Sequence, residues 1–355
     1  MWKKLVLAAS LAACSTAYAA DELHLYNWNN YLSEETAKQF EKECKCKLVQ
    51  DYYGDNEEML AKLAAGAKGY DIVVPTGFAV QTLIGQKGAA PLDKAQLSNL
   101  KNINPGYMGG FFDKANTYSV PYAFTTTVLG YNETQLQKAG VLDKANSWAL
   151  IFDPAVVSKI KGKVTVLDSQ RELMAAALMY LGYPANETDP AKWKQAQQVI
   201  LKAKPYWAAF NNQSYIKELT VGNAWVSLGY SNDLFQAQQD ALKAKRPFKL
   251  NFSLQQEGNT LSMDNLVILK DAPRKDLAHK FINFMLDGKN AAELTNEVGA
   301  GNPNQAAMPN VKPEITKQSA IFPSKEALPK LQQLQDLNGK QRRELNKLWS
   351  EIKLK

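Results

Sequence analysis

The chain contains 355 residues, of which 45% are hydrophobic and 22% are charged, and its formal net charge is +7. This composition is typical of a globular protein long enough for two lobes, and it excludes an intrinsically disordered chain. The lysines are scattered along the sequence rather than clustered, so we expect solvated faces and no nucleic-acid partner.

The first residues have the pattern of a secretory signal peptide. A basic start ending at Lys4 precedes an apolar run over 5–13, and Ala17-Tyr18-Ala19 fits the small-x-small cleavage pattern. The apolar run is too short to cross a bilayer, which needs roughly 20 residues. Cys14 lies in a lipoprotein-like box, so lipid anchoring is the less favoured alternative. We predict a signal peptide over 1–19 and an exported, periplasmic protein.

Two further cysteines, Cys44 and Cys46, are separated by a single residue. This spacing is poor geometry for an unstrained disulfide. The chain also lacks a second cysteine pair that would complete a zinc site. We therefore expect two free thiols without a redox or metal role.

Strands and helices are predicted to alternate in the first part of the chain. Ser33 is a favourable N-cap, and Asp55 with Glu58 resembles a capping box. Such alternation predicts an α/β fold with a mainly parallel sheet covered on both faces. Ligands in these sheets bind beyond the carboxyl ends of the strands. The expected strands are 23–27, 47–53 and 71–74, and the expected helices run from Ser33 to about 43 and from Asp55 to 66.

The middle of the chain continues the pattern, and its strand ends carry polar or aromatic clusters. The strands over 118–122 and 127–131 are expected to cross between the lobes. The other expected strands are 163–167, 224–228 and 261–269, with a helix over 173–181 and another around Phe235. Three of the clusters include a carboxylate, namely Glu172, Asp233 and Asp264.

A catalytic interpretation has little support in the sequence. His24 and His279 are the only histidines, and we expect both to be structural. Nucleophile-elbow, zinc-protease and phosphate-loop motifs are absent. The three carboxylates could perform acid–base chemistry, as in glycoside hydrolysis, but carboxylates at strand ends also stabilise helix N-termini. For Glu172 ligand binding and helix stabilisation stay equally open, whereas Asp233 favours a ligand.

Six short segments, spread almost from end to end, carry a family resemblance. They are Leu25-Tyr26-Asn27-Trp28-Asn29-Asn30-Tyr31, Tyr70-Asp71-Ile72-Val73-Val74-Pro75, Tyr118-Ser119-Val120-Pro121-Tyr122, Arg171-Glu172, Leu228-Gly229-Tyr230-Ser231-Asn232-Asp233 and Phe281-Ile282-Asn283-Phe284-Met285-Leu286. In this order they resemble the periplasmic spermidine- and putrescine-binding proteins of bacterial ABC importers. The segment 229–233 and the C-terminal helix near Arg342 and Trp349 are more similar to the putrescine-binding branch.

The resemblance implies a two-lobed periplasmic binding protein fold of type II. Each lobe would be a central, mainly parallel sheet flanked by helices, with the ligand cleft between the lobes. The first lobe is expected over 21–127 plus 263–308, and the second over 128–262 plus 309–355. The lobes would close on a polyamine by a hinge motion, and the closed protein, a monomer, would dock on an inner-membrane ABC permease. Neither chemistry nor a cofactor is expected.

The resemblance also implies the residues that bind the ligand. Carboxylates would hold the ammonium groups by charge-assisted hydrogen bonds, and aromatic rings would cover the methylene chain and attract the charges. By position, the aromatic wall is Trp28, Tyr31, Phe78 and Tyr230; the carboxylates are Glu172, Asp264 and, from the putrescine branch, Asp233; and the smaller polar contacts are Asn29, Thr76 and Ser169.

Two departures from the family pattern leave the exact amine open. Ser262 and Ala300 stand where the family usually has aromatic rings, which implies a wider pocket and a ligand bulkier than putrescine. Three alternatives stay open: a ligand-responsive sensor subunit, a binding protein for another solute, and a secreted hydrolase that uses the paired carboxylates. The strand-end clusters offer mainly acids, with Arg171 as the exception, and this asymmetry favours a cationic ligand.

Overall fold

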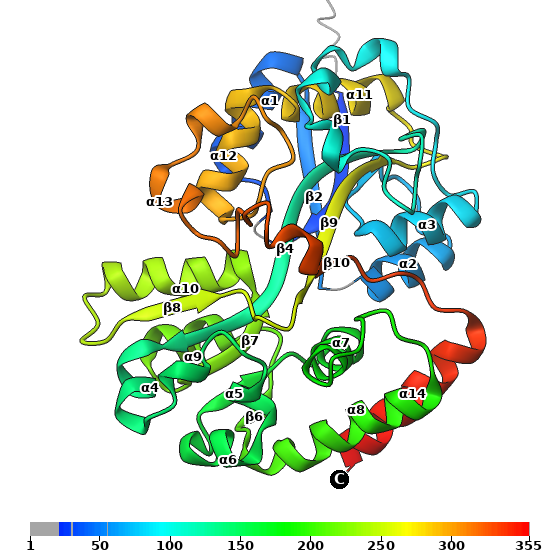
Figure 1. Ribbon diagram of the computed structural model, residues 1–355. Helices are drawn as coiled ribbons and strands as arrows, with labels where there is room; N and C mark the ends of the chain where they lie inside the picture. The colour runs from blue at the N-terminus through cyan, green and yellow to red at the C-terminus, as the bar shows by residue number, and fades with distance from the viewer. Residues whose placement is uncertain (1–20, 30, 55, 355) are drawn as a thin grey trace, which may run out of the picture.

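The structure, a computed structural model, describes residues 21–29, 31–54 and 56–354, and the chain forms two lobes (Figure 1). The predicted signal peptide, the lipidation alternative at Cys14 and the predicted cap at Asp55 lie outside the described residues. Within the described residues, no helix combines the length and the apolar character that a membrane span requires.

The elements alternate as the sequence predicts. The strands are β1 Glu22–Trp28, β2 Lys47–Tyr53, β3 Ile72–Val73, β4 Ser119–Asn132, β5 Val164–Val166, β6 Ala209–Phe210, β7 Val226–Tyr230, β8 Leu250–Ser253, β9 Asn259–Ile268 and β10 Leu331–Gln332. The α-helices are α1 Glu34–Cys44, α2 Asn56–Ala64, α3 Gly77–Gly85, α4 Glu133–Ala139, α5 Ala149–Phe152, α6 Pro154–Val157, α7 Gln170–Tyr180, α8 Pro190–Ala203, α9 Tyr215–Val221, α10 Ser231–Lys243, α11 Lys275–Met285, α12 Gly288–Val298, α13 Pro313–Thr316 and α14 Gly339–Leu354.

The strands form one mixed sheet that runs through both lobes, in the order β2-β1-β3-β9-β4-β7-β5-β6. β1 pairs in parallel with β2 and β3, and β5 pairs in parallel with β6 and β7, in line with the predicted parallel pairing. The centre is antiparallel instead, because β4 pairs antiparallel with β7, β8 and β9, and β9 pairs antiparallel with β3. The expectation of a separate, mainly parallel sheet in each lobe therefore needs this correction.

β4 is the reason for the continuous sheet. The sequence predicts two strands, 118–122 and 127–131, but the structure joins them in one strand of 14 residues. A strand of that length spans roughly 46 Å, which is long enough to pass from one lobe into the other. β9 runs beside it in the same way (Figure 1).

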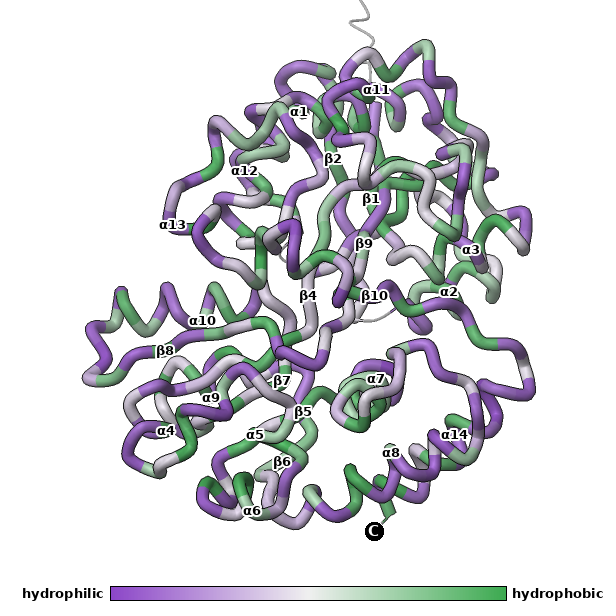
Figure 2. Tube along the Cα trace, viewed as in Figure 1, coloured by the Kyte–Doolittle hydropathy of each residue, from purple (hydrophilic) through white to green (hydrophobic). Residues whose placement is uncertain are grey.

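Two separate hydrophobic cores accompany the two lobes. One core takes its buried side chains from 23–124 and 261–300, and the other takes them from 128–252 and 291–352. The change between cores falls between Phe124 and Val128 in β4. In Figure 2 hydrophobic residues gather in α7 and the strands, and the outer helices α8 and α14 are more hydrophilic. The exact lobe boundaries stay a prediction.

Cys44 and Cys46 form a disulfide, so the prediction of two free thiols is wrong. Cys44 is the last residue of α1, and Lys45 follows it in the left-handed conformation with φ of 55°. This turn reverses the chain and leaves the two Cα atoms 5.2 Å apart, a separation that suits a disulfide. The spacing of the cysteines does not predict this turn, because lysine rarely adopts the left-handed conformation.

Candidate functional site

Asp264, in β9, is one of the buried carboxylates that the sequence predicts. The Tyr31 hydroxyl donates a hydrogen bond of 2.8 Å to its Oδ2 atom. The other oxygen, Oδ1, is buried and has no hydrogen-bond partner among the described residues. Burial raises the pKa of Asp264 to about 7, and the Tyr31 hydrogen bond opposes this shift. Asp264 therefore offers one free acceptor oxygen in a desolvated position.

The sheet brings this pair together from distant parts of the chain. Tyr31 follows β1 and Thr76 follows β3, and these strands are parallel, so both residues leave the same edge of the sheet. Thr76 then forms an antiparallel bridge with Asp264. The Thr76 Oγ1 atom is also buried without a partner in the described part of the chain. The sheet therefore brings Tyr31 and Thr76, which follow parallel strands, together with Asp264 in β9.

Asp233, in the first turn of α10, is held by two donors. The Tyr215 hydroxyl donates to its Oδ2 atom, and the Asn232 side-chain amide donates to its Oδ1 atom over 2.9 Å. Burial raises the pKa of Asp233 to about 6, and both hydrogen bonds oppose the shift. The sequence interpretation missed Tyr215, which comes from α9, and also Asn232, although Asn232 is adjacent to a predicted site residue.

Glu172 lies in the first turn of α7, and Ser169 caps this helix by accepting a bond of 3.4 Å from the Glu172 backbone N–H. The Glu172 side chain does not turn back to its own helix, because Oε2 accepts a hydrogen bond of 2.6 Å from the Thr260 hydroxyl of β9. Burial raises the pKa of Glu172, while Thr260, Thr127 and the neighbouring Arg171 charge oppose the increase.

The pKa of the Tyr230 hydroxyl responds to the charges of all three carboxylates. Burial raises this pKa well above the ordinary value, and the negative charges of Glu172, Asp233 and Asp264 add to the increase. The pKa of Tyr31 is also raised well above its ordinary value. Burial is the largest cause, Asp264 comes next, and the charge of Asp233 has a smaller effect. Several carboxylates buried together are costly without a compensating cation, so this region is suited to a positively charged ligand.

The predicted aromatic and polar residues differ in how closely they join this group. Trp28 is half-buried, and its indole N–H donates a bond of 2.8 Å to the Val74 carbonyl oxygen. Its ring lies 4.6 Å, between centroids, from Tyr53, whose own pKa is raised by burial and by the charge of Asp264. Phe78 is half-buried in the first turn of α3, and Asn29 is exposed, so Asn29 is the weakest of the predicted contacts.

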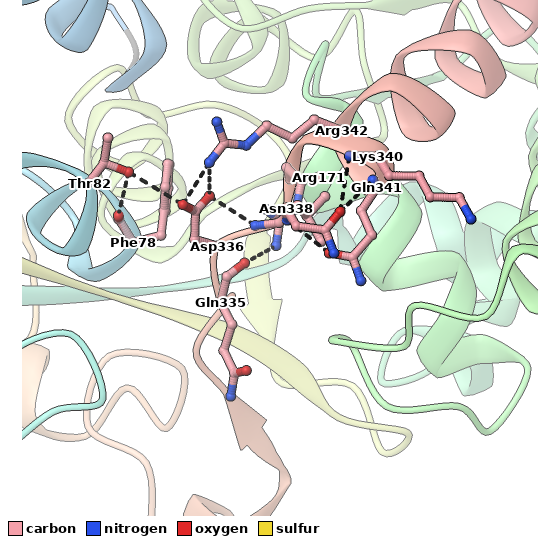
Figure 3. Close-up of polar contacts among 10 residues, drawn as sticks. Phe78, Thr82, Arg171, Gln335, Asp336, Asn338, Lys340, Gln341 and Arg342 are labelled. Atoms are coloured by element: carbon pink, nitrogen blue, oxygen red, sulfur yellow. Dashed lines mark hydrogen bonds and ion pairs between the residues drawn. The ribbon is translucent and has the colours of Figure 1, made fainter. Parts of the chain in front are cut away.

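The segment before α14 borders this region (Figure 3). Asp336 accepts hydrogen bonds of 2.8 and 2.7 Å from Arg342 and one of 3.5 Å from the hydroxyl of Thr82, one turn after Phe78. Arg171 donates a bond of 2.7 Å to the Gln335 carbonyl oxygen. The same short segment therefore contacts α3 of one lobe and α7 of the other.

Several observations define what the site can do. The unpartnered buried oxygens here belong to Thr76, Asn232 and Asp264, and such atoms call for a ligand that donates hydrogen bonds. Within the described residues no group of histidine, cysteine or acidic side chains is arranged to hold a metal ion.

The Nε2 atom of His279 accepts a bond of 2.9 Å from the Asp93 backbone N–H, in agreement with its predicted structural role.

Two hollows in the surface lie elsewhere. One, of about 430 Å³, borders the Cys44–Cys46 disulfide, and the other, of about 1050 Å³, lies between α1, α11 and α12. Neither includes a predicted site residue. The buried carboxylates and their unpartnered oxygens, rather than the size of a hollow, identify the candidate site.

Comparison with known proteins shows the family to which the chain belongs. The family model of bacterial extracellular solute-binding proteins matches residues 35–323. A putrescine/cadaverine-binding protein of Pseudomonas aeruginosa is 56% identical over 356 residues and covers 100% of both chains. The putrescine-binding periplasmic protein PotF of Escherichia coli is 32% identical and covers 99% of this chain and 97% of its own.

Solved structures give the same answer for the fold. A spermidine/putrescine ABC transporter substrate-binding protein, PotD, from Streptococcus pneumoniae has a TM-score of 0.82 at 25% identity, over 94% of this chain and 99% of its own. The predicted family resemblance and the two-lobed α/β fold are thus confirmed. The relatives are solute-binding proteins rather than enzymes, so the prediction of a non-enzyme is confirmed as well. The chain belongs to the family of bacterial extracellular solute-binding proteins.

Proposed function

We propose that the protein captures a polyamine of the putrescine or spermidine type in the periplasm and delivers it to an ABC permease. The observation that carries the proposal is the group of buried carboxylates Glu172, Asp233 and Asp264 around Tyr230, with one oxygen of Asp264 unpartnered. A ligand with several ammonium groups would neutralise this group. The names of the relatives, a putrescine/cadaverine-binding protein and the putrescine-binding periplasmic protein PotF, support the same ligand class.

The binding mode follows from the contacts. One ammonium group would donate to the free Oδ1 atom of Asp264 and to the Thr76 hydroxyl, and the other would face Asp233 or Glu172. The methylene chain would lie against aromatic rings, Trp28 among them, and an ammonium group over a ring face would add a cation–π contact on the order of 0.5–2 kcal/mol. The remaining proposed contacts are Asn29, Tyr31, Phe78, Ser169 and Tyr230.

In the transport cycle the two lobes would close on the ligand by a hinge motion. The first lobe would comprise 21–127 plus 263–308, and the second 128–262 plus 309–355. The closed protein would act as a monomer and dock on the inner-membrane permease. Export would depend on the signal peptide over 1–19, with lipid anchoring at Cys14 as the less favoured route. In this proposal the protein performs no chemistry and needs neither a cofactor nor a nucleic acid.

Isothermal titration of the purified protein with putrescine, cadaverine, spermidine, spermine and agmatine tests the proposal. Saturable one-to-one binding of any of these amines supports it, and the ranking reports how Ser262 and Ala300 shape the pocket. Ala300 is fully buried and Ser262 is half-buried. A preference for plain putrescine would contradict the expectation of a bulkier ligand. Absence of measurable binding for every amine in the panel would overturn the polyamine proposal.

A further inference from the structure

Trp28 and Tyr53 form a pair whose side chains share one acceptor. The two residues are partners in the parallel register of β1 and β2. Their ring centroids lie 4.6 Å apart with a tilt of 55°. The Trp28 indole N–H donates a bond of 2.8 Å to the Val74 carbonyl oxygen, and the Tyr53 hydroxyl donates one of 2.5 Å to the same atom. Since a carbonyl oxygen has two lone pairs, both bonds form together.

The chain that follows this carbonyl also holds Asp264. The Pro75 carbonyl oxygen accepts a bond of 2.9 Å from the Asn265 backbone N–H, and Thr76 forms a bridge with Asp264. The three residues 74–76 are therefore attached to the Trp28 ring at one end and to the Asp264 backbone at the other. Segment 74–76 therefore sets the distance between the Trp28 ring and Asp264.

Tyr53 is suited to hold the Val74 carbonyl in place beside the Trp28 indole. Its side chain is 3% exposed and packs between Trp28 and Tyr26, with a ring distance to Tyr26 of 4.8 Å. Burial and the charge of Asp264 raise the pKa of Tyr53 well above its ordinary value. The hydroxyl thus keeps its proton and remains a donor.

We infer that Tyr53 is a positioning residue, which holds the Trp28 ring at a set place relative to Asp264 through the shared Val74 carbonyl. This inference rests on the proposed function, because it assumes that Trp28 covers the ligand. Tyr53 itself need not touch the amine. Nothing in the sequence pattern marks it, since it ends a strand among the aromatic residues of a core.

The substitution Tyr53→Phe removes the hydroxyl and keeps the ring. The Val74 carbonyl retains the Trp28 donor, so no buried polar group is left unpaired, and we expect a free energy of unfolding close to that of the wild type. We expect the affinity for the best amine of the titration panel to fall about threefold to tenfold, which lies in the lower part of the coupling range for residues in contact. Tyr70→Phe is the matched control, because Tyr70 donates to Asp51 and stacks on Tyr26, away from the shared carbonyl.

A double-mutant cycle with Trp28→Ala distinguishes positioning from a general structural effect. If Tyr53 acts through Trp28, Tyr53→Phe changes the affinity of the Trp28→Ala protein by less than about twofold. Full additivity of the two losses, or an unchanged affinity for Tyr53→Phe alone, would overturn the inference while wild-type binding still stood. Absence of amine binding by the wild type would instead overturn the proposed function, so the two failures are distinguishable.

Discussion

Tyr31 and Asp264, 233 positions apart in the chain, share a buried hydrogen bond of 2.8 Å. The bond occupies one carboxylate oxygen, and the other oxygen stays without a partner among the described residues. A buried acceptor left in this state has a free-energy cost. A ligand ammonium group would remove that cost, so this half-satisfied carboxylate is where we expect most of the binding energy.

The substitution Asp264→Asn tests this expectation. It keeps the size of the side chain but removes the charge and offers an N–H₂ group to the site. We expect amine binding to weaken by about 2–5 kcal/mol, because an ammonium group would then lose its buried ionic partner. Isothermal titration measures the change.

The exposed Asp276, in the first turn of α11, provides the matched control. Asp276→Asn should leave the affinity unchanged. If both variants bound the amine as tightly as the wild type, the site would have been assigned to the wrong carboxylate.

The stability of the unliganded protein should depend on pH through Asp264 and Asp233. Burial raises their pKa values from 3.8 to about 7 and about 6, so the folded state keeps protons that the unfolded chain releases. Their contribution to the free energy of unfolding is therefore complete below about pH 4 and is lost as the pH rises through 7. Denaturant unfolding of the wild type and of Asp264→Asn measures this, and the variant should show the flatter profile.

Amine affinity should have the opposite dependence on pH. A cation binds the ionised carboxylates, so the affinity should increase as the pH rises from about 5 to 8 and then level off, since Asp264 is largely ionised only above its pKa of about 7. Titrations across this range measure the profile. An affinity that stayed constant between these values would show that neither Asp264 nor Asp233 contacts the ammonium groups.

Gly229, next to Tyr230 in β7, should not tolerate a side chain. A Cβ atom there would overlap the ring of Tyr215, whose hydroxyl holds Asp233. Gly229→Ala should therefore destabilise the protein by about 1–3 kcal/mol, the usual cost of overpacking, and should also weaken amine binding. Thermal unfolding and titration measure the two effects.

Gly85→Ala is the control for this substitution, because Gly85 has open space around it and an ordinary backbone conformation. It should leave the affinity unchanged, and it should leave the stability unchanged or raise it slightly, because alanine restricts the unfolded chain. Weaker binding in Gly85→Ala of the same size as in Gly229→Ala would contradict the explanation through Tyr215.

The disulfide between Cys44 and Cys46 should matter little for stability or binding. It closes a loop of only three residues, and the loop-closure estimate is then no more than about 2 kcal/mol. The double variant Cys44→Ser with Cys46→Ser should fold, bind the amine with wild-type affinity and lose at most that amount of unfolding free energy. A large loss of affinity would instead connect the end of α1 to the ligand site.

Much of the local structure is predictable from the sequence because neighbouring residues determine it. Ser33 caps α1 by accepting a bond from the Thr36 backbone N–H, as its position before two glutamates predicts. β2 begins and ends at the predicted residues, Lys47 and Tyr53. Glu172 and Asp233 follow the parallel strands β5 and β7, so their meeting at one edge of the sheet could be expected from the sequence, whereas Asp264 lies within β9, which is antiparallel to its neighbours β3 and β4.

The partners of these carboxylates were not predictable in this way. Tyr215 lies 18 positions before Asp233, and Thr260 lies 88 positions after Glu172. Neither residue has a motif that marks it, because each contact depends on how helices and strands pack. The left-handed Lys45, and with it the disulfide, is another feature that residue spacing did not reveal.

By itself, the sequence determined the alternating elements, the family resemblance and the acidic, aromatic character of the site. These properties depend on residue types and on short-range spacing, which a linear chain already contains. Only the tertiary structure decided that β4 and β9 join both lobes in one mixed sheet, and that Tyr31, Tyr215 and Thr260 orient the carboxylates. Those contacts join residues from separate elements, and the physical reason is that burial and hydrogen bonding act through space rather than along the chain.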